Sequence, residues 1–79
     1  MVVEKVREIL LKTGRLSVPV EQLADDSDLY IVGLTSLATV GLMLALEEEF
    51  DIEIPDAMLG RKTFASIGSI VEVVQRLNR

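Results

Sequence analysis

The stretch that decides the fold is GLTSLATVGLMLALEEEFDIEIPD, residues 33–56. Its apolar residues are dense and helix-forming, and they are followed by a run of glutamates. The hydroxyls of Thr35 and Ser36 can each accept an unpaired backbone N–H, so either residue can begin a helix. We expect this helix to run to about Phe50.

A helix and a long loop precede this stretch. Residues 2–13 place apolar side chains at helical spacing with charged residues between them, and Gly14 is expected to end that helix in a left-handed conformation. Residues 15–34 show no sustained period and predict a surface loop. Loops of that length within compact domains are usually functional. The apolar residues expected to pin the loop are Leu16, Val18, Val20, Leu23 and Leu29.

Two shorter patterns follow. Pro55 precedes a short element over 57–59, with Asp56 as its candidate cap, and Ser66 is expected to cap the last helix. The last helix carries one apolar stripe, made of Ile67, Ile70, Val71, Val74 and Leu77. The chain, residues 1–79, is therefore predicted to be a single all-α domain. We expect a small four-helix bundle of three longer helices and one short helix, with a long loop between the first and second helices.

Composition limits the chemistry available to this chain. It contains 79 residues with no cysteine and no histidine, and only three residues are aromatic. The lack of cysteine excludes disulfides, thiolate metal sites and a protein thiol nucleophile, and it fits a reducing cytoplasmic setting. The commonest general base is also missing. The best remaining candidates, Tyr30 and scattered carboxylates, show no paired arrangement, so we do not expect an enzyme.

Charge is distributed unevenly along the chain. Residues 21–56 hold ten of the thirteen acids and none of the eight bases, and the net charge is −5. Such a surface attracts basic protein surfaces and repels nucleic-acid phosphates, so no nucleic-acid partner is expected. The acids lack the spacing of a calcium-binding loop, and we predict no metal site. No cationic amino-terminal stretch precedes an apolar run, which predicts no secretory signal.

One uncharged run reaches the length of a membrane-spanning segment. It extends from Leu29 to Leu46, but aspartates precede it, glutamates follow it, and no lysine or arginine anchors either end. Gly33, Thr35 and Ser36 also interrupt it. A loop followed by a helix explains the run better, and no membrane span is expected.

The helix after Thr35 carries more apolar residues than one buried face requires. One stripe consists of Leu42, Leu46 and Phe50, and a second of Leu37, Val40 and Leu44. Two interpretations stay open. Both stripes can be buried in a small core, or the second can be a partner-docking surface rimmed by Glu47 and Glu48.

The same stretch carries a family resemblance. Gly33-Leu34-Thr35-Ser36-Leu37, continued by LMLALEEEFDIEIPD at 42–56, resembles the Gly-x-Asp-Ser-Leu attachment site and acidic recognition helix of the acyl carrier protein family. Nearly the whole chain fits that pattern. Further agreement comes from the Asp28-Leu29 pair, the Ile54-Pro55-Asp56 turn and the last helix opening at Ser66.

The resemblance implies a carrier that is a substrate of enzymes. A phosphopantetheinyl transferase would attach 4'-phosphopantetheine from coenzyme A to the Ser36 hydroxyl, and the thiol of that arm would carry acyl groups as thioesters. An anion at a helix amino terminus is favoured by unpaired N–H groups and the helix dipole. Other expected partners are acyl ligases, synthases or acyltransferases with basic docking patches, acting on a monomeric carrier.

Two further groups of site residues follow from this interpretation. The predicted partner-docking face consists of Thr35, Leu37, Ala38, Val40, Gly41, Leu44, Glu47, Glu48 and Asp56. The residues predicted to line an acyl cavity are Leu42, Leu46, Phe50, Ile54, Ile67 and Val71.

The chain also departs from the family pattern. Thr35 replaces the usual aspartate, and Ala38 and Gly41 are neutral where many relatives carry acids. A helix-interior glycine costs about 0.5–1 kcal/mol relative to alanine, so Gly41 needs a reason such as close approach of a partner. We therefore expect a specialised carrier for fatty acid or lipid-related synthesis with few partners. The alternatives are an aminoacyl or polyketide carrier and an unmodified helical adaptor.

Overall fold

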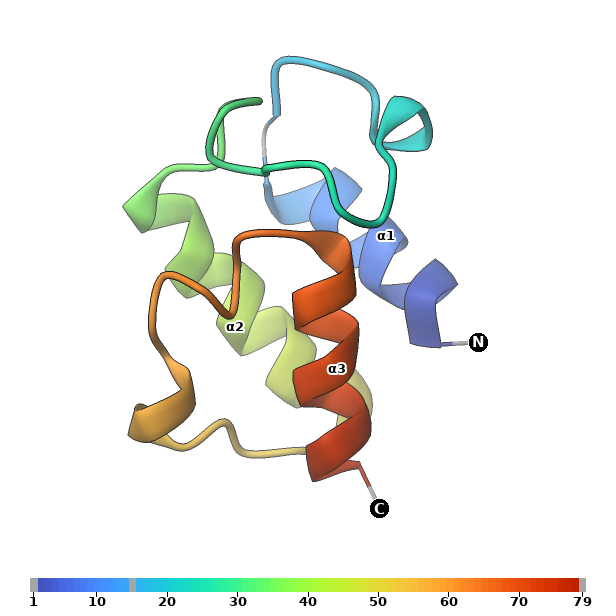
Figure 1. The fold of residues 1–79 in the computed structure, drawn as a ribbon. Coiled ribbons are helices and arrows are strands. Elements are labelled where there is room, and N and C mark those ends of the chain that lie inside the picture. Colours follow the sequence, from blue (N-terminus) through green and yellow to red (C-terminus); the bar gives the residue numbers. More distant parts are fainter. Residues whose placement is uncertain (1, 15, 79) are drawn as a thin grey trace.

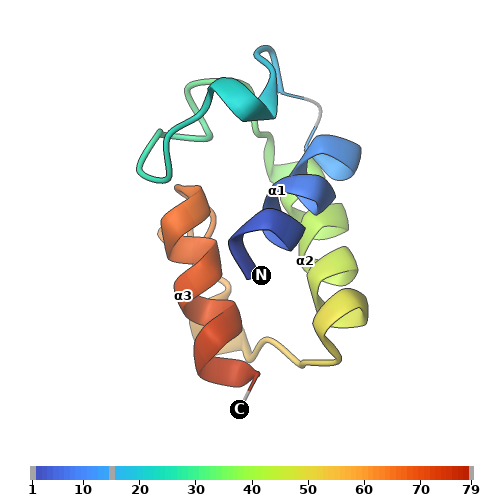
Figure 2. The ribbon, with the colours of Figure 1, turned by 90° about the vertical axis from the view of Figure 1, so that its right-hand side faces the viewer.

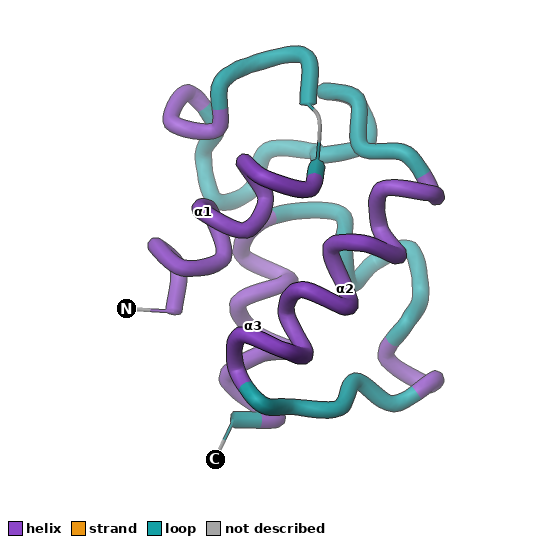
Figure 3. Tube along the Cα trace, turned by 180° about the vertical axis from the view of Figure 1, so that it is seen from behind, coloured by secondary structure: helices purple, strands orange, loops and turns teal. Residues whose placement is uncertain are grey.

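The computed structural model describes residues 2–14 and 16–78 and shows an all-helical domain (Figures 1 and 3). Its described residues include no strand. The elements are the α-helices α1 (Val2–Thr13), α2 (Ser36–Phe50) and α3 (Ile67–Leu77) and the 3-10 turns η1 (Val20–Gln22) and η2 (Asp56–Met58). The predicted all-α class is confirmed. The expected fourth helix is a single 3-10 turn, so the bundle has three helices rather than four.

The helix α1 lies at the centre of the packing. It contacts both α2 and α3 as well as η1, and Figure 2 shows it crossing between the other two helices. The core is built from aliphatic side chains with one phenylalanine. Its buried residues are Val6, Ile9, Leu10, Val20, Leu23, Leu29, Leu34, Leu42, Leu46, Phe64, Ile67, Ile70 and Val74.

The end of α1 corrects one prediction. The helix ends at Thr13 as expected, but Gly14 is not left-handed. Its N–H donates to the Leu10 carbonyl oxygen at 2.8 Å, and an added Cβ would lie 2.9 Å from Leu10 Cδ1. An added Cβ would also lie 2.8 Å from the Leu10 carbonyl oxygen, which is backbone and cannot easily move, so glycine is required here by close packing against Leu10.

Arg7 fixes the first half of the long loop to α1. Its guanidinium donates to the carbonyl oxygens of Val20 at 3.0 Å and Leu23 at 2.9 Å, and it forms an ion pair with Asp25 at 2.9 Å. Val20 and Leu23 turn their side chains into the core at the same place. The loop is thus held by burial and by charge-assisted hydrogen bonds together.

The second half of the loop is anchored by Leu29. This side chain is completely buried, and its N–H donates to the Ala65 carbonyl oxygen at 2.8 Å. Gly33 then adopts a φ of 110°, which a residue with a side chain rarely adopts. The Leu34 N–H returns to the Leu29 carbonyl oxygen at 2.9 Å, and Leu34 is buried directly before α2.

The predicted cap of α3 is confirmed. The Ser66 hydroxyl accepts the Ser69 N–H at 3.1 Å, and the Ser69 hydroxyl accepts the Ser66 N–H at 3.1 Å, so the two serines form a reciprocal capping box. The Gly68 N–H donates to the Asp25 carbonyl oxygen at 2.8 Å. The start of α3 is therefore also tied to the long loop.

The turn η2 differs from its prediction. It begins at Asp56, and Pro55 occupies the position before it with no side-chain cap hydrogen bond. Asp56 is consequently part of the turn and does not cap it.

The uncharged run from Leu29 to Leu46 divides into loop and helix, as predicted. In the described part of the chain, no helix has both the length and the apolar character needed to cross a membrane.

Leu29→Ala should lower the free energy of unfolding by about 2–5 kcal/mol, because it leaves a cavity at a completely buried position. Urea unfolding followed by circular dichroism measures the change. Ile31→Ala is the matched control in the same loop, since Ile31 is 81% exposed, and it should change stability by less than about 0.5 kcal/mol. Equal changes in the free energy of unfolding for the two substitutions would show that the Leu29 side chain is not part of the hydrophobic core.

Candidate functional site

Ser36 is the first residue of α2 and is exposed. The residue before it caps the helix: Thr35 Oγ1 accepts the Ala38 N–H at 3.1 Å. The Ser36 hydroxyl forms no hydrogen bond with any residue in 2–14 or 16–78. Thr35 thus caps the helix, and the exposed Ser36 hydroxyl beside it is not engaged in capping.

The surroundings of Ser36 fit the phosphodiester that the resemblance implies. Within the described chain, the backbone N–H groups of Ser36 and Leu37 have no hydrogen-bond partner. The first turn of α2 carries no acidic side chain. Unpaired N–H groups at a helix start favour an anion, and Thr35 in place of the usual aspartate removes a repulsive charge.

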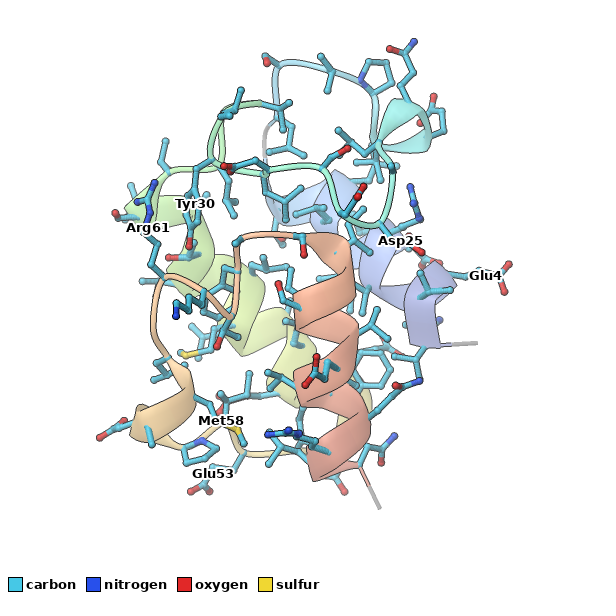
Figure 4. All side chains as sticks on the ribbon, viewed as in Figure 1. Glu4, Asp25, Tyr30, Glu53, Met58 and Arg61 are labelled. Carbon is cyan, nitrogen blue, oxygen red and sulfur yellow. The ribbon has the colours of Figure 1, made fainter. Side chains whose placement is uncertain are left out.

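A pocket of about 210 Å³ lies beside Ser36. Its lining residues come from the long loop, from α2 and from the segment before α3, and they are Tyr30, Ser36, Thr39, Leu59, Gly60, Arg61 and Phe64. The Arg61 guanidinium carbon lies 3.9 Å from the centre of the Tyr30 ring, and the Tyr30 hydroxyl donates to the Arg61 carbonyl oxygen at 2.7 Å (Figure 4). Tyr30 therefore holds Arg61 in two ways.

Sequence reasoning missed this pocket. The sequence indicates Tyr30 only as a weak catalytic candidate, and it indicates no role for Arg61. The two residues are 31 positions apart, so no periodicity links them. The available signals were that Tyr30 is the one tyrosine in the chain and that Arg61 is the first base after the acidic stretch.

Burial raises the pKa of the Tyr30 hydroxyl above its ordinary value. The positive charge of Arg61 opposes this shift, and the negative charge of Asp28 adds to it. Tyr30 is therefore protonated at neutral pH, as a hydrogen-bond donor to the Arg61 carbonyl must be.

The second apolar stripe of α2 faces solvent. Leu37 is 84% exposed, Val40 52% and Leu44 55%, while Leu42 and Leu46 are buried. The interpretation in which both stripes are buried is therefore wrong. Of the other predicted docking residues, Thr35, Gly41, Glu48 and Asp56 are exposed, and Ala38 and Glu47 are half-buried.

One member of this face has a property that sequence reasoning did not foresee. The Glu47 carboxylate accepts the Ile54 N–H at 2.9 Å, so it holds the segment after α2 as well as contributing charge. Asp56 lies on η2, the short element in which the sequence placed it. Gly41 lies in the open, where an added Cβ would meet nothing within 4 Å. No described neighbour explains its lack of a side chain.

A second hollow lies next to the start of α2. It has a volume of about 590 Å³, and its lining includes the end of α1 and four predicted docking residues. The lining residues are Lys12, Thr13, Gly14, Gly33, Thr35, Leu37, Ala38 and Gly41. The face of α2 that carries Leu37 is therefore continuous with a groove against α1.

The residues predicted to line an acyl cavity belong to the packed interior. Leu42, Leu46, Ile54 and Ile67 are buried, and Phe50 and Val71 are half-buried against the core. The pocket beside Ser36 is lined by other residues. An acyl cavity among these six stays a prediction. The described acids, despite their number, nowhere gather in a group of three that could hold a metal ion.

Known proteins resemble this chain in both sequence and fold. The family model described as "Phosphopantetheine attachment site" matches residues 4–77. The aminoacyl carrier protein of Agrobacterium fabrum is 56% identical over 70 residues, which cover 89% of this chain and 84% of that protein.

Solved structures agree with the fold. A crystal structure of an engineered Bradyrhizobium japonicum glycine:[carrier protein] ligase, complexed with a carrier protein from Agrobacterium tumefaciens and AMP, contains a similar chain. That chain is 53% identical with a TM-score of 0.89, and the match covers 92% of this chain and 97% of the other. The solution structure of a holo acyl carrier protein from Nitrosomonas europaea is 33% identical with a TM-score of 0.82, covering 94% and 92%.

The Tyr30 environment makes a pH-dependent prediction. Because the folded-state pKa lies above the unfolded-state value, the stabilisation linked to Tyr30 is complete below the unfolded-state pKa and is lost as pH rises through the folded-state pKa. Ultraviolet titration of this single tyrosine should therefore give a higher midpoint in native protein than in denaturant. Arg61→Gln should raise the native midpoint further and Asp28→Asn should lower it. Coinciding native and denatured midpoints would contradict the assigned burial.

Proposed function

Because this chain belongs to the phosphopantetheine attachment site family of carrier proteins, which confirms the resemblance seen in the sequence, we propose that it is an aminoacyl carrier protein. Proteins of this family hold 4'-phosphopantetheine covalently and are not themselves enzymes. In the proposal, Ser36 is the attachment residue and the arm carries an amino acid as a thioester.

The observation that carries the assignment of Ser36 is the division of roles at the start of α2. A serine that capped the helix would have its hydroxyl engaged, but here Thr35 accepts the capping N–H and the Ser36 hydroxyl is unbonded. Attachment therefore removes no hydrogen bond from the fold. In the transferase step, the Ser36 oxygen would bond to the phosphorus that carries pantetheine in coenzyme A. The pyrophosphate bond of coenzyme A would break, releasing adenosine 3',5'-bisphosphate, and the hydroxyl proton would be lost.

Two observations favour an aminoacyl cargo over the fatty acid or lipid cargo that we first expected. The first is the similarity to a protein named as an aminoacyl carrier and to a carrier seen with a glycine:[carrier protein] ligase. The second is the packing of Leu42, Leu46 and Ile67, which are essentially inaccessible to solvent. An amino acid is small and charged, and it needs no apolar cavity in the carrier.

The proposed partner is a dedicated ligase with a basic docking patch. The α2 face offers it exposed apolar residues, Leu37, Val40 and Leu44, together with the carboxylate of Glu48. The neutral positions Thr35, Ala38 and Gly41 make the first turns less acidic than the family norm, which suits a restricted set of partners. We propose that the carrier acts as a cytoplasmic monomer.

Loading in two steps tests the function. Coenzyme A and a broad-specificity phosphopantetheinyl transferase should add one phosphopantetheinyl group, seen as a single increment in intact mass. Ser36→Ala should abolish the increment and keep the helical circular dichroism spectrum, because Thr35 caps α2. Thr39→Ala, which removes a neighbouring hydroxyl from the same pocket, should still be loaded.

A glycine:[carrier protein] ligase with ATP and glycine should then add one glycyl group that hydroxylamine removes, as expected for a thioester. Loading by a fatty acyl ligase but not by any aminoacyl ligase would restore the fatty acid interpretation. No phosphopantetheinyl increment at all would support the unmodified helical adaptor.

The docking face makes a separate prediction. Leu44→Ser should lower kcat/KM of ligase loading roughly tenfold, because an apolar contact at the centre of an interface contributes on the order of 1–2 kcal/mol. Leu11→Ser is the matched control, since Leu11 is 62% exposed on α1 and Leu44 is 55% exposed on α2. Neither substitution should change the free energy of unfolding by more than about 0.5 kcal/mol. Equal loading of the two variants would remove Leu44 from the docking face.

A further inference from the structure

The described cations fall into two groups. Those on the helices are each paired with an acid: Lys5 with Glu49, Arg7 with Asp25, Lys12 with Glu8, and Arg76 with Glu72. Arg61 and Lys62, in the segment between η2 and α3, form no ion pair with any acid in the described ranges. The two unpaired charges are therefore adjacent in the chain.

Of these two cations, Arg61 is the one that lines the pocket beside Ser36. Tyr30 holds it in place through the ring face under the guanidinium and through the hydroxyl bond to its carbonyl oxygen (Figure 4). Tyr30 is itself fixed, because its N–H donates to the Asp28 carboxylate at 2.9 Å. The guanidinium has five N–H donors, and none of them forms a hydrogen bond within the described chain.

We propose that Arg61 is the protein ligand for the phosphodiester on Ser36, and that it seats the first part of the arm in the pocket between Tyr30 and Thr39. The inference rests on the proposed attachment at Ser36. A guanidinium can donate two parallel hydrogen bonds to a phosphate group, which makes it the best matched side chain for this anion. Because Tyr30 has already ordered Arg61, binding costs less side-chain entropy than a free surface arginine would lose.

The local charge gives the contact a further role. The stretch from 21 to 56 contains ten acids and no base, so the phosphodiester adds another negative charge to an already acidic region. Arg61 lies just beyond that stretch in sequence, and in the folded chain its guanidinium packs on the ring of Tyr30, which belongs to the stretch. It offsets the repulsion and directs the arm towards one side of α2.

Nuclear magnetic resonance of loaded protein tests the proposal. In wild type, loading should shift the Arg61 Nε–Hε resonance, and the ³¹P resonance of the native phosphodiester should differ from that of the same protein in denaturant. Arg61→Gln should move the ³¹P resonance towards the denatured position. Lys62→Gln removes the same charge from the neighbouring residue and should leave the ³¹P resonance at the wild-type position. Arg61→Lys should give an intermediate position.

An Arg61 Nε–Hε resonance that does not respond to loading would overturn the inference. So would equal ³¹P positions in Arg61→Gln and wild type, or equal displacements in Arg61→Gln and Lys62→Gln. Should Arg61→Gln fail to fold, the wild-type Nε–Hε resonance decides alone. Intact mass separates the two proposals, because an unloaded protein refutes attachment at Ser36, whereas a loaded protein without an Arg61 response refutes only the contact.

Discussion

The burial of Leu29 is the constraint on which the rest of the structure depends. A domain of this size buries only about 60% of the surface that its unfolded chain exposes, so three helices alone leave one end of the core open. The long loop closes that end with Leu29 and Leu34, and the Leu29 N–H joins the loop to the segment before α3. Since Leu34 is buried two residues before Ser36, the same anchoring fixes where the chain emerges. Ser36, the proposed attachment residue, is therefore exposed only two residues after a buried anchor.

The helix α2 leaves apolar side chains exposed at a cost in stability. Burying a leucine or valine stabilises a fold by about 1.5–3 kcal/mol relative to leaving it exposed. Leu37, Val40 and Leu44 forgo most of that stabilisation, and Gly41 adds the conformational cost of glycine within a helix. Nothing in the described chain compensates for these residues. A small domain keeps such a helix where a partner covers it, which is how the proposed ligase would use this face.

Local signals in the sequence predicted the helices well. The bounds of α1 and the two apolar stripes of α2 follow from periodicity, and the Ser66 cap follows from the position of a hydroxyl. Periodicity left open whether the second stripe of α2 is buried or exposed. The prediction for Gly14 was wrong because two different structural requirements select the same residue type. Gly14 is needed for close packing against Leu10 and not for a left-handed turn, and both causes select glycine. The contact between Tyr30 and Arg61 has no local signal, because only the folded loop brings the two side chains together.

The packed interior bears on what a carrier of this kind can hold. Opening a cavity of about 100 Å³ between core leucines would cost roughly 2 kcal/mol, at about 24 cal/mol per Å³. The whole stability of a 79-residue domain is on the order of 4–12 kcal/mol, so a cavity that stands empty before loading would use a large part of it. An aminoacyl group requires no such opening, because its ammonium group is better solvated by water than by a core. The carrier therefore has no need to recognise its proposed cargo. In the proposed function, the partner ligase selects the amino acid. The carrier has to supply only a docking face for that ligase and a fixed position for the start of the arm.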